Sequence, residues 1–140
     1  MRLEHLFDLD LRYEGDYVVV RPYGGLDGVG YAAGAGRATG PRIEGGVRFS
    51  NNPRVRGDGV LLADLAGAIA TDDGARVVFS MNGLGRKAEK EGVFDAVVAM
   101  TLESDDERYA WVSEALCVAE VRVVGRRVEM HVHQLLARGS

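Results

Sequence analysis

Asp64 and His5 are the two residues whose types and positions predict acid–base chemistry in this sequence. Asp64 precedes the run Leu-Ala-Gly-Ala-Ile-Ala, and a two-residue turn at Asp73-Gly74 would place it at the end of an otherwise apolar strand face. Removal from water disfavours the charged form of a carboxyl and suits it to proton transfer. The alternative is a structural carboxylate at a rim, bonded to a backbone N–H.

His5 alternates in phase with Leu3 and Phe7, so we expect its ring to point inward. There it would act as a general base or remain a neutral histidine with one hydrogen bond. His131 and His133 stand two residues apart, as a metal-binding pair on a strand would. Because the sequence fixes no third ligand near them, we expect a surface ion-pair ladder, no metal site and no cofactor.

The elements that must position these residues are β-strands, because apolar and polar residues alternate with a period of two along most of the chain. Turn-forming residues separate about eight to ten such segments, and 19 glycines allow strands to bend. The predicted fold is a single domain over 1–140, a closed or nearly closed antiparallel β-barrel with one short helix at 104–114 that Ser104 could cap. The residues 50–58 are read as an exposed loop, and the strands are expected near 3–11, 17–22, 29–35, 42–49, 60–71, 75–82, 93–103, 116–124 and 127–136.

Two hairpins predict which residues face inward. A two-residue turn at Asp73-Gly74 turns three alanines toward bulky partners and leaves a small-residue cavity; the expected pairs are Ala70 with Val77, Ala68 with Phe79, Ala66 with Met81 and Asp64 with Gly83. A turn at Gly125-Arg126 places Val121 and Met130 on the buried face; the expected outward pairs are Arg122 with Glu129 and Glu120 with His131.

Composition limits the classes of function and partner. With 17 Lys and Arg against 21 Asp and Glu, the chain has a net charge of -4, so we expect no nucleic-acid partner. Cys117 is the single cysteine, which suits a reducing cytoplasm, and the charged N-terminal segment is neither a signal peptide nor a membrane span. We also expect self-association, as a dimer, through strand surface at 118–124.

Three segments resemble a known family. Residues 36–46 (GRATGPRIEGG), 64–83 and 106–118 are similar to the bacterial domain-of-unknown-function 3237 family, with Thr71-Asp72-Asp73-Gly74-Ala75 as the most specific match. The resemblance implies a small soluble β-barrel, often associated, with no generally assigned activity. Family-like positions are Gly36, Gly40, Pro41, Asp64, Asp73, Gly74, Tyr109 and Trp111.

The chain departs from the family between residues 46 and 59. Family members usually carry Gly-x-Asp-aromatic where this sequence has Phe49-Ser50-Asn51-Asn52. An asparagine there retains only the hydrogen bonding of an aspartate, so an acid or base role does not transfer to it.

Two hypotheses of function follow. The first is a cofactor-free isomerase, lyase or cyclase on a small carbonyl-containing metabolite, with Asp64 and His5 as catalytic residues. The second is a calycin-like barrel that binds a small apolar ligand without catalysis. In both, the expected pocket opens near Asp64, and the candidate ligand-binding residues are Arg37, Asn51, Asn52, Ala66, Met81, Tyr109 and Trp111.

Overall fold

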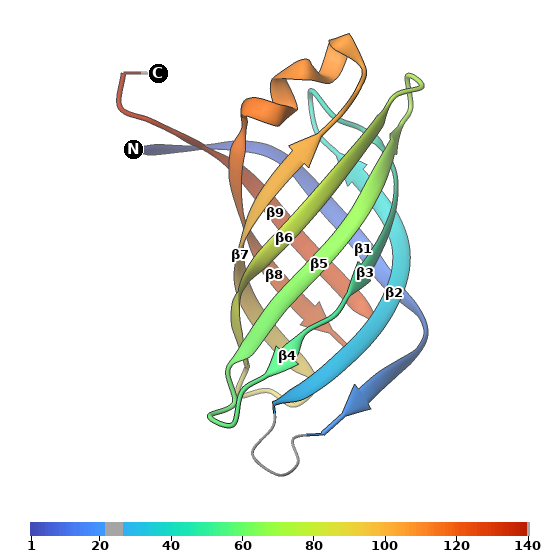
Figure 1. The fold of residues 1–140 in the computed structure, drawn as a ribbon, viewed down its shortest axis with the longest axis vertical. Helices are drawn as coiled ribbons and strands as arrows, with labels where there is room; N and C mark the ends of the chain where they lie inside the picture. The colour runs from blue at the N-terminus through green and yellow to red at the C-terminus, as the bar shows by residue number, and fades with distance from the viewer. Residues whose placement is uncertain (22–26, 140) are drawn as a thin grey trace.

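Nine antiparallel strands form the sheet of the computed structural model, which describes residues 1–21 and 27–139 (Figure 1). The sheet runs in the order β1-β9-β8-β7-β6-β5-β3-β2 and closes through the pairing of β1 with β2, while the short β4 pairs with β2 and β5. The predicted closed antiparallel barrel is therefore confirmed; the end of the strand predicted at residue 22 lies outside the described residues. The strands are β1 (Arg2–Val20), β2 (Gly28–Thr39), β3 (Gly45–Asn51), β4 (Arg54–Val55), β5 (Leu61–Thr71), β6 (Arg76–Lys87), β7 (Val93–Glu103), β8 (Leu116–Val124) and β9 (Arg127–Leu136).

Alternation of apolar and polar residues gives most of the strands one buried and one exposed face. In β1, for example, Leu9, Leu11 and Tyr13 are buried, whereas Asp10 and Arg12 are exposed. The inward side chains form one apolar core inside the barrel. The largest fully buried side chains are Phe7, Phe79, Leu9, Leu11, Ile43, Ile69, Met81, Met100, Leu102 and Met130.

The predicted register of the β5–β6 hairpin is wrong by one residue. The loop contains three residues, 72–74, because Thr71 N–H donates to the Ala75 carbonyl at 2.9 Å and the Thr71 hydroxyl accepts from Ala75 N–H at 2.7 Å. Gly74 takes a positive φ of 94°, which suits the left-handed position of such a loop. The ladder consequently pairs Ala70 with Arg76, Ala68 with Val78 and Ala66 with Ser80, and these alanines lie on the outside of the barrel, not along a cavity.

The predicted register of the β8–β9 hairpin is confirmed. Arg122 pairs with Glu129 and Glu120 pairs with His131, while Val121 is buried opposite Met130. β7 and β9 pair with both edges of β8, so only the outer face of 118–124 is open, and dimerisation through it stays a prediction.

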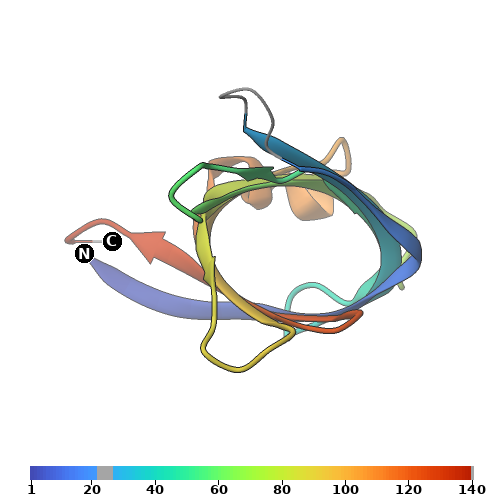
Figure 2. The ribbon, with the colours of Figure 1, turned by 90° about the horizontal axis from the view of Figure 1, so that it is seen from below.

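A short helix lies across one end of the barrel (Figures 1 and 2). It is a 3-10 helix, η1 (Glu107–Glu114), and it begins later than predicted. Its cap is Asp106, which accepts from Arg108 N–H, whereas the Ser104 hydroxyl donates to the Arg76 carbonyl. The residues 50–58 are not wholly a loop, since β3 ends at Asn51 and β4 follows. In the part of the chain that the structure describes, no helix is long and apolar enough to cross a membrane.

Candidate functional site

All three histidines of the chain lie together on the outside of the barrel, around Asp8. One oxygen of the Asp8 carboxylate, Oδ1, lies 2.7 Å from His5 Nε2 and 2.8 Å from His131 Nδ1. The His5 and His133 rings meet edge to face, with centroids 5.3 Å apart. We refer to Asp8, His5, His131 and His133 as the histidine cluster.

The cluster arises from the β1–β9 ladder and from one irregularity in β1. The ladder pairs His5 with His133 and Asp8 with His131, but its register shifts between His5 and Phe7. Leu6 and Phe7 are consecutive and both buried, so the alternation of faces is interrupted there. This shift places His5 on the outer face with Asp8, and the prediction that His5 points inward is therefore wrong.

Hydrogen bonding sets the charge of the cluster. Bonds from His131 and from His5 lower the pKa of Asp8, and the bond to Asp8 raises the pKa of His131, although burial opposes that rise. An ionised carboxylate only accepts hydrogen bonds, so the Nδ1 of His131 carries the hydrogen in this pair. The Nε2 of His131 makes no hydrogen bond with a described residue and is left to exchange a proton with a bound molecule.

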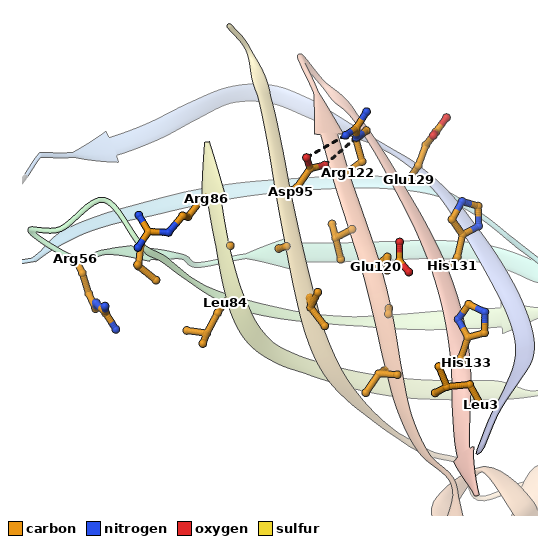
Figure 3. Close-up of a pocket in the computed structure, with 17 residues that line it drawn as sticks. Leu3, Arg56, Leu84, Arg86, Asp95, Glu120, Arg122, Glu129, His131 and His133 are labelled. Atoms are coloured by element: carbon orange, nitrogen blue, oxygen red, sulfur yellow. Dashed lines mark hydrogen bonds and ion pairs between the residues drawn. The ribbon is translucent and has the colours of Figure 1, made fainter. Parts of the chain in front are cut away.

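A groove of about 1080 Å³ adjoins the cluster on the outer face of β6–β9 (Figure 3). Its floor is apolar. Leu84 and Val97 are 58% and 60% exposed, and Val118 is half-buried beside them. Eight of the 17 lining residues are charged or histidine, so the groove combines an apolar floor with polar groups that can orient a small molecule.

One continuous row of paired residues links the floor of the groove to the cluster. It crosses β6, β7, β8, β9 and β1 at Leu84, Val97, Glu120, His131 and Asp8 in turn. Paired residues on neighbouring antiparallel strands have their Cβ atoms about 5 Å apart. Glu120 therefore stands between the apolar floor and His131, and Figure 3 shows both side chains on the same side of the sheet.

Charged residues close the far border of the groove. Arg122 donates to both Asp95 carboxylate oxygens, at 2.8 and 3.0 Å, across β7 and β8. Arg86 also lines the groove and makes no hydrogen bond or ion pair with a residue that the structure describes. Among these described residues, no group of three His, Cys, Asp or Glu side chains is arranged to hold a metal ion.

Tyr109 and Trp111 belong to a different cluster, at the end of the barrel covered by η1. The Tyr109 hydroxyl lies 2.9 Å from both carboxylate oxygens of Asp73, which also accepts from the Thr71 hydroxyl at 2.6 Å. The Arg42 guanidinium lies 3.5 Å above the Trp111 ring. These contacts tie the β5–β6 hairpin and the 40–44 segment to the helix, beside a small polar pocket of about 370 Å³.

The pocket predicted near Asp64 is not formed. Asp64 pairs with Asn82 on the outer face and is exposed, so its predicted inward position is wrong. Ala66 is exposed while Met81 is fully buried, which places them on opposite faces of the sheet. Both errors have one cause, the extra residue in the β5–β6 loop.

The remaining predicted ligand-binding residues are dispersed. Arg37 is bonded to Asp72, and Asn51 donates to the Tyr13 hydroxyl at 3.1 Å inside the barrel. Asn52 is exposed and its backbone N–H donates to the Asp64 carbonyl. The structure therefore does not bring Arg37, Asn51 and Asn52 together around one cavity.

Sequence reasoning missed Asp8 and Glu120 as site residues and set His131 aside as part of an ion-pair ladder. The β8–β9 turn did place Glu120 beside His131, which was a usable signal. Nothing local indicated Asp8, because it is 123 residues from His131 and meets it only through the β1–β9 ladder.

The family model described as "Protein of unknown function (DUF3237)" matches residues 1–135. None of the curated proteins compared with the chain matches it.

Solved structures share the fold at low identity. A conserved protein of unknown function from Rhodopseudomonas palustris has a TM-score of 0.84 at 21% identity, covering 96% of this chain and 97% of its own. A β-barrel-like protein from Acinetobacter baumannii has a TM-score of 0.87 at 16% identity, covering 96% of each chain. A structure described as an enzyme, from Penicillium herquei, has a TM-score of 0.66 at 17% identity, covering 94% of this chain and 93% of its own. At these identities the likeness shows a shared fold.

Proposed function

The chain belongs to the DUF3237 family of proteins of unknown function, and we propose from its own side chains that it is a cofactor-independent acid–base enzyme. Its substrate class is a small carbonyl-containing metabolite bound in the outer groove, and its reaction is an isomerisation, lyase or cyclisation step that begins with proton transfer. The observation that carries the proposal is the Asp8–His131 hydrogen bond of 2.8 Å at the border of that groove.

The geometry supports a division of roles between His131 and Glu120. Protonated His131, held through Nδ1 by Asp8, would donate its Nε2 proton to the carbonyl oxygen of the substrate. The Glu120 carboxylate would take the proton from the carbon next to that carbonyl, which leaves a neutral enol. Glu120 then returns its proton to a different carbon of a conjugated enol while the enol hydroxyl returns its proton to His131, so both residues end in the states in which they began.

Other residues would position the substrate and the acid. The apolar floor of Leu84 and Val97 would contact the carbon skeleton, and a groove of about 1080 Å³ has room for a small metabolite. His5 shares Oδ1 of Asp8 with His131, so it would fix the orientation of that carboxylate.

Two further considerations favour catalysis over simple binding. The Penicillium structure with this fold is described as an enzyme, so the fold is compatible with catalysis. The binding-barrel hypothesis requires a cavity beside Ala66, Ala68 and Ala70, and these three alanines lie on the outer face of β5.

Deuterium exchange tests the proposal without knowledge of the natural substrate. A panel of small aldehydes, ketones and keto acids is incubated with the protein in D2O, and exchange at the carbon next to each carbonyl is followed by proton NMR. We expect exchange above the buffer rate for a subset of the panel, and a loss of about 100-fold or more in His131→Gln and Glu120→Gln.

His133→Gln is the matched control, because His133 lies in the same cluster but does not contact Asp8 in the described structure. It should retain most of the exchange activity. Equal exchange rates in the wild type and His131→Gln, or a wild type no faster than buffer across the panel, would contradict the proposal.

A further inference from the structure

In the second half of β1, one edge is not paired with any residue that the structure describes. Its pairing with β9 ends at Arg12 opposite Arg127, and the last bond on that side is Tyr13 N–H to the Arg126 carbonyl. After a register shift, Val18, Val19 and Val20 pair only with β2. No backbone hydrogen bond to another described residue covers the opposite edge of 18–20, and Figure 1 shows this end of β1 with a strand on one side alone.

The unpaired edge is apolar and exposed. Val18, Val19 and Val20 are 55%, 61% and 58% exposed, and Tyr17 beside them is 45% exposed. Soluble proteins usually protect such an edge with charge, proline or a covering segment, because a row of free N–H and C=O groups with β-branched side chains pairs readily with another strand. The stretch 17–20 has no charged residue and no proline, and none of the described residues pairs with its outer edge.

We propose that this edge binds the same edge of a second copy of the chain as an antiparallel strand pair, with the two-fold axis at Val19. Each copy has a net charge of -4, so most approaches between copies are repulsive, whereas 17–20 is uncharged. A continuous sheet through two barrels would result.

Side-chain complementarity fixes the axis at Val19. In a symmetric antiparallel pair a residue on the axis faces its own copy, which leaves Val18 or Val19 at the centre of this stretch. With Val19 on the axis, Tyr17 faces Arg21 of the other copy, and the guanidinium can lie against the ring on both sides of the axis. With Val18 on the axis, Asp16 would face Val20 and Tyr17 would face Val19, so the contact between Tyr17 and Arg21 would be lost on both sides of the axis.

Charge placed on the axis tests the interface. Analytical ultracentrifugation from micromolar to submillimolar protein should show a monomer–dimer equilibrium for the wild type. Val19→Lys should weaken dimerisation about tenfold or more, because two lysines would face each other where two valines met. Val78→Lys is the matched control: Val78 is 58% exposed on β6, whose edges are both paired, and it should dimerise like the wild type.

A cross-link tests the register. Val19→Cys should form a disulfide-linked dimer on mild oxidation, because facing Cα atoms in an antiparallel pair lie about 5 Å apart, within disulfide range. Val78→Cys should not, and the native Cys117 is fully buried. A wild type that stays monomeric throughout the concentration range would overturn the proposal. A Val19→Lys variant that dimerises normally would also overturn it, as would a Val19→Cys variant that cross-links no faster than Val78→Cys. Either result would mean that any dimer forms through another surface.

Discussion

Gly83→Ala should destabilise the barrel strongly, because β6 and β7 approach closely at this position. A Cβ atom built on Gly83 would lie 2.0 Å from the Val97 carbonyl oxygen and 2.6 Å from the Val98 Cα, where ordinary contact begins at 3.4 Å. Both neighbours are backbone atoms of β7, so no side-chain rotation relieves the overlap. The strands would have to separate by about 1.4 Å, which breaks roughly two ladder hydrogen bonds and costs about 2–4 kcal/mol of the free energy of unfolding.

Gly46→Ala is the matched control for the same change. Its added Cβ would meet nothing within 4 Å and its φ is not positive, so the alanine fits the folded strand. Its remaining effect is to reduce the conformational entropy of the unfolded chain. We expect a gain of about 0.5 kcal/mol. Urea unfolding followed by far-ultraviolet circular dichroism and by the fluorescence of Trp111 measures both free energies. A loss below about 1 kcal/mol for Gly83→Ala, or an equal loss for Gly46→Ala, would refute the close-approach argument.

Three further outcomes follow from the polar contacts and the buried thiol. The Asp8–His131 pair should stabilise the fold most between about pH 4 and pH 6.5, because the pKa of Asp8 is lowered and that of His131 is raised on folding. This stabilisation is lost as pH falls through the folded pKa of Asp8 or rises through the folded pKa of His131. Because both side chains are largely exposed, it should not exceed about 1 kcal/mol. The measurement is the difference in unfolding free energy between the wild type and Asp8→Asn across pH. Tyr109→Phe should cost about 1–2 kcal/mol in urea unfolding and raise the pKa of Asp73, seen by carboxyl NMR, since it removes the hydroxyl that donates to that carboxylate. Burial raises the pKa of Cys117 to about 11, so iodoacetamide should label it only after denaturant is added, as mass spectrometry would show.

The architecture could be predicted from the sequence because it depends on short-range patterns. The alternation of apolar and polar residues located the strands, and the Gly125 turn fixed the β8–β9 register correctly. The Asp73 turn did not fix the β5–β6 register, since Asp-Asp-Gly is compatible with a two-residue or a three-residue loop. The hydroxyl of Thr71 decides between them by accepting from Ala75 N–H, and a single residue of difference exchanges the two faces.

The candidate site could not be predicted because it depends on a bulge and on a long-range ladder. Strict alternation along β1 predicts that His5 faces the core. The structure places it on the outer face because Leu6 and Phe7 are consecutive and both buried. No local sequence pattern predicts the register shift between His5 and Phe7. The meeting of Asp8 with His131 requires the first and last strands to pair in one particular register, which the sequence alone leaves undetermined.

The pairing of β1 with β9 also has a consequence during synthesis. β1 leaves the ribosome first among the described strands and β9 last, so β1 must wait for more than a hundred residues before one of its neighbours exists. Contacts this distant in sequence slow folding, and until they form, β1 and β8 each expose an edge to other nascent chains. The Asp8–His131 bond spans the β1–β9 ladder, which is the last to form during synthesis, so its NMR signal would distinguish completed barrels from chains that have folded all but the final strand.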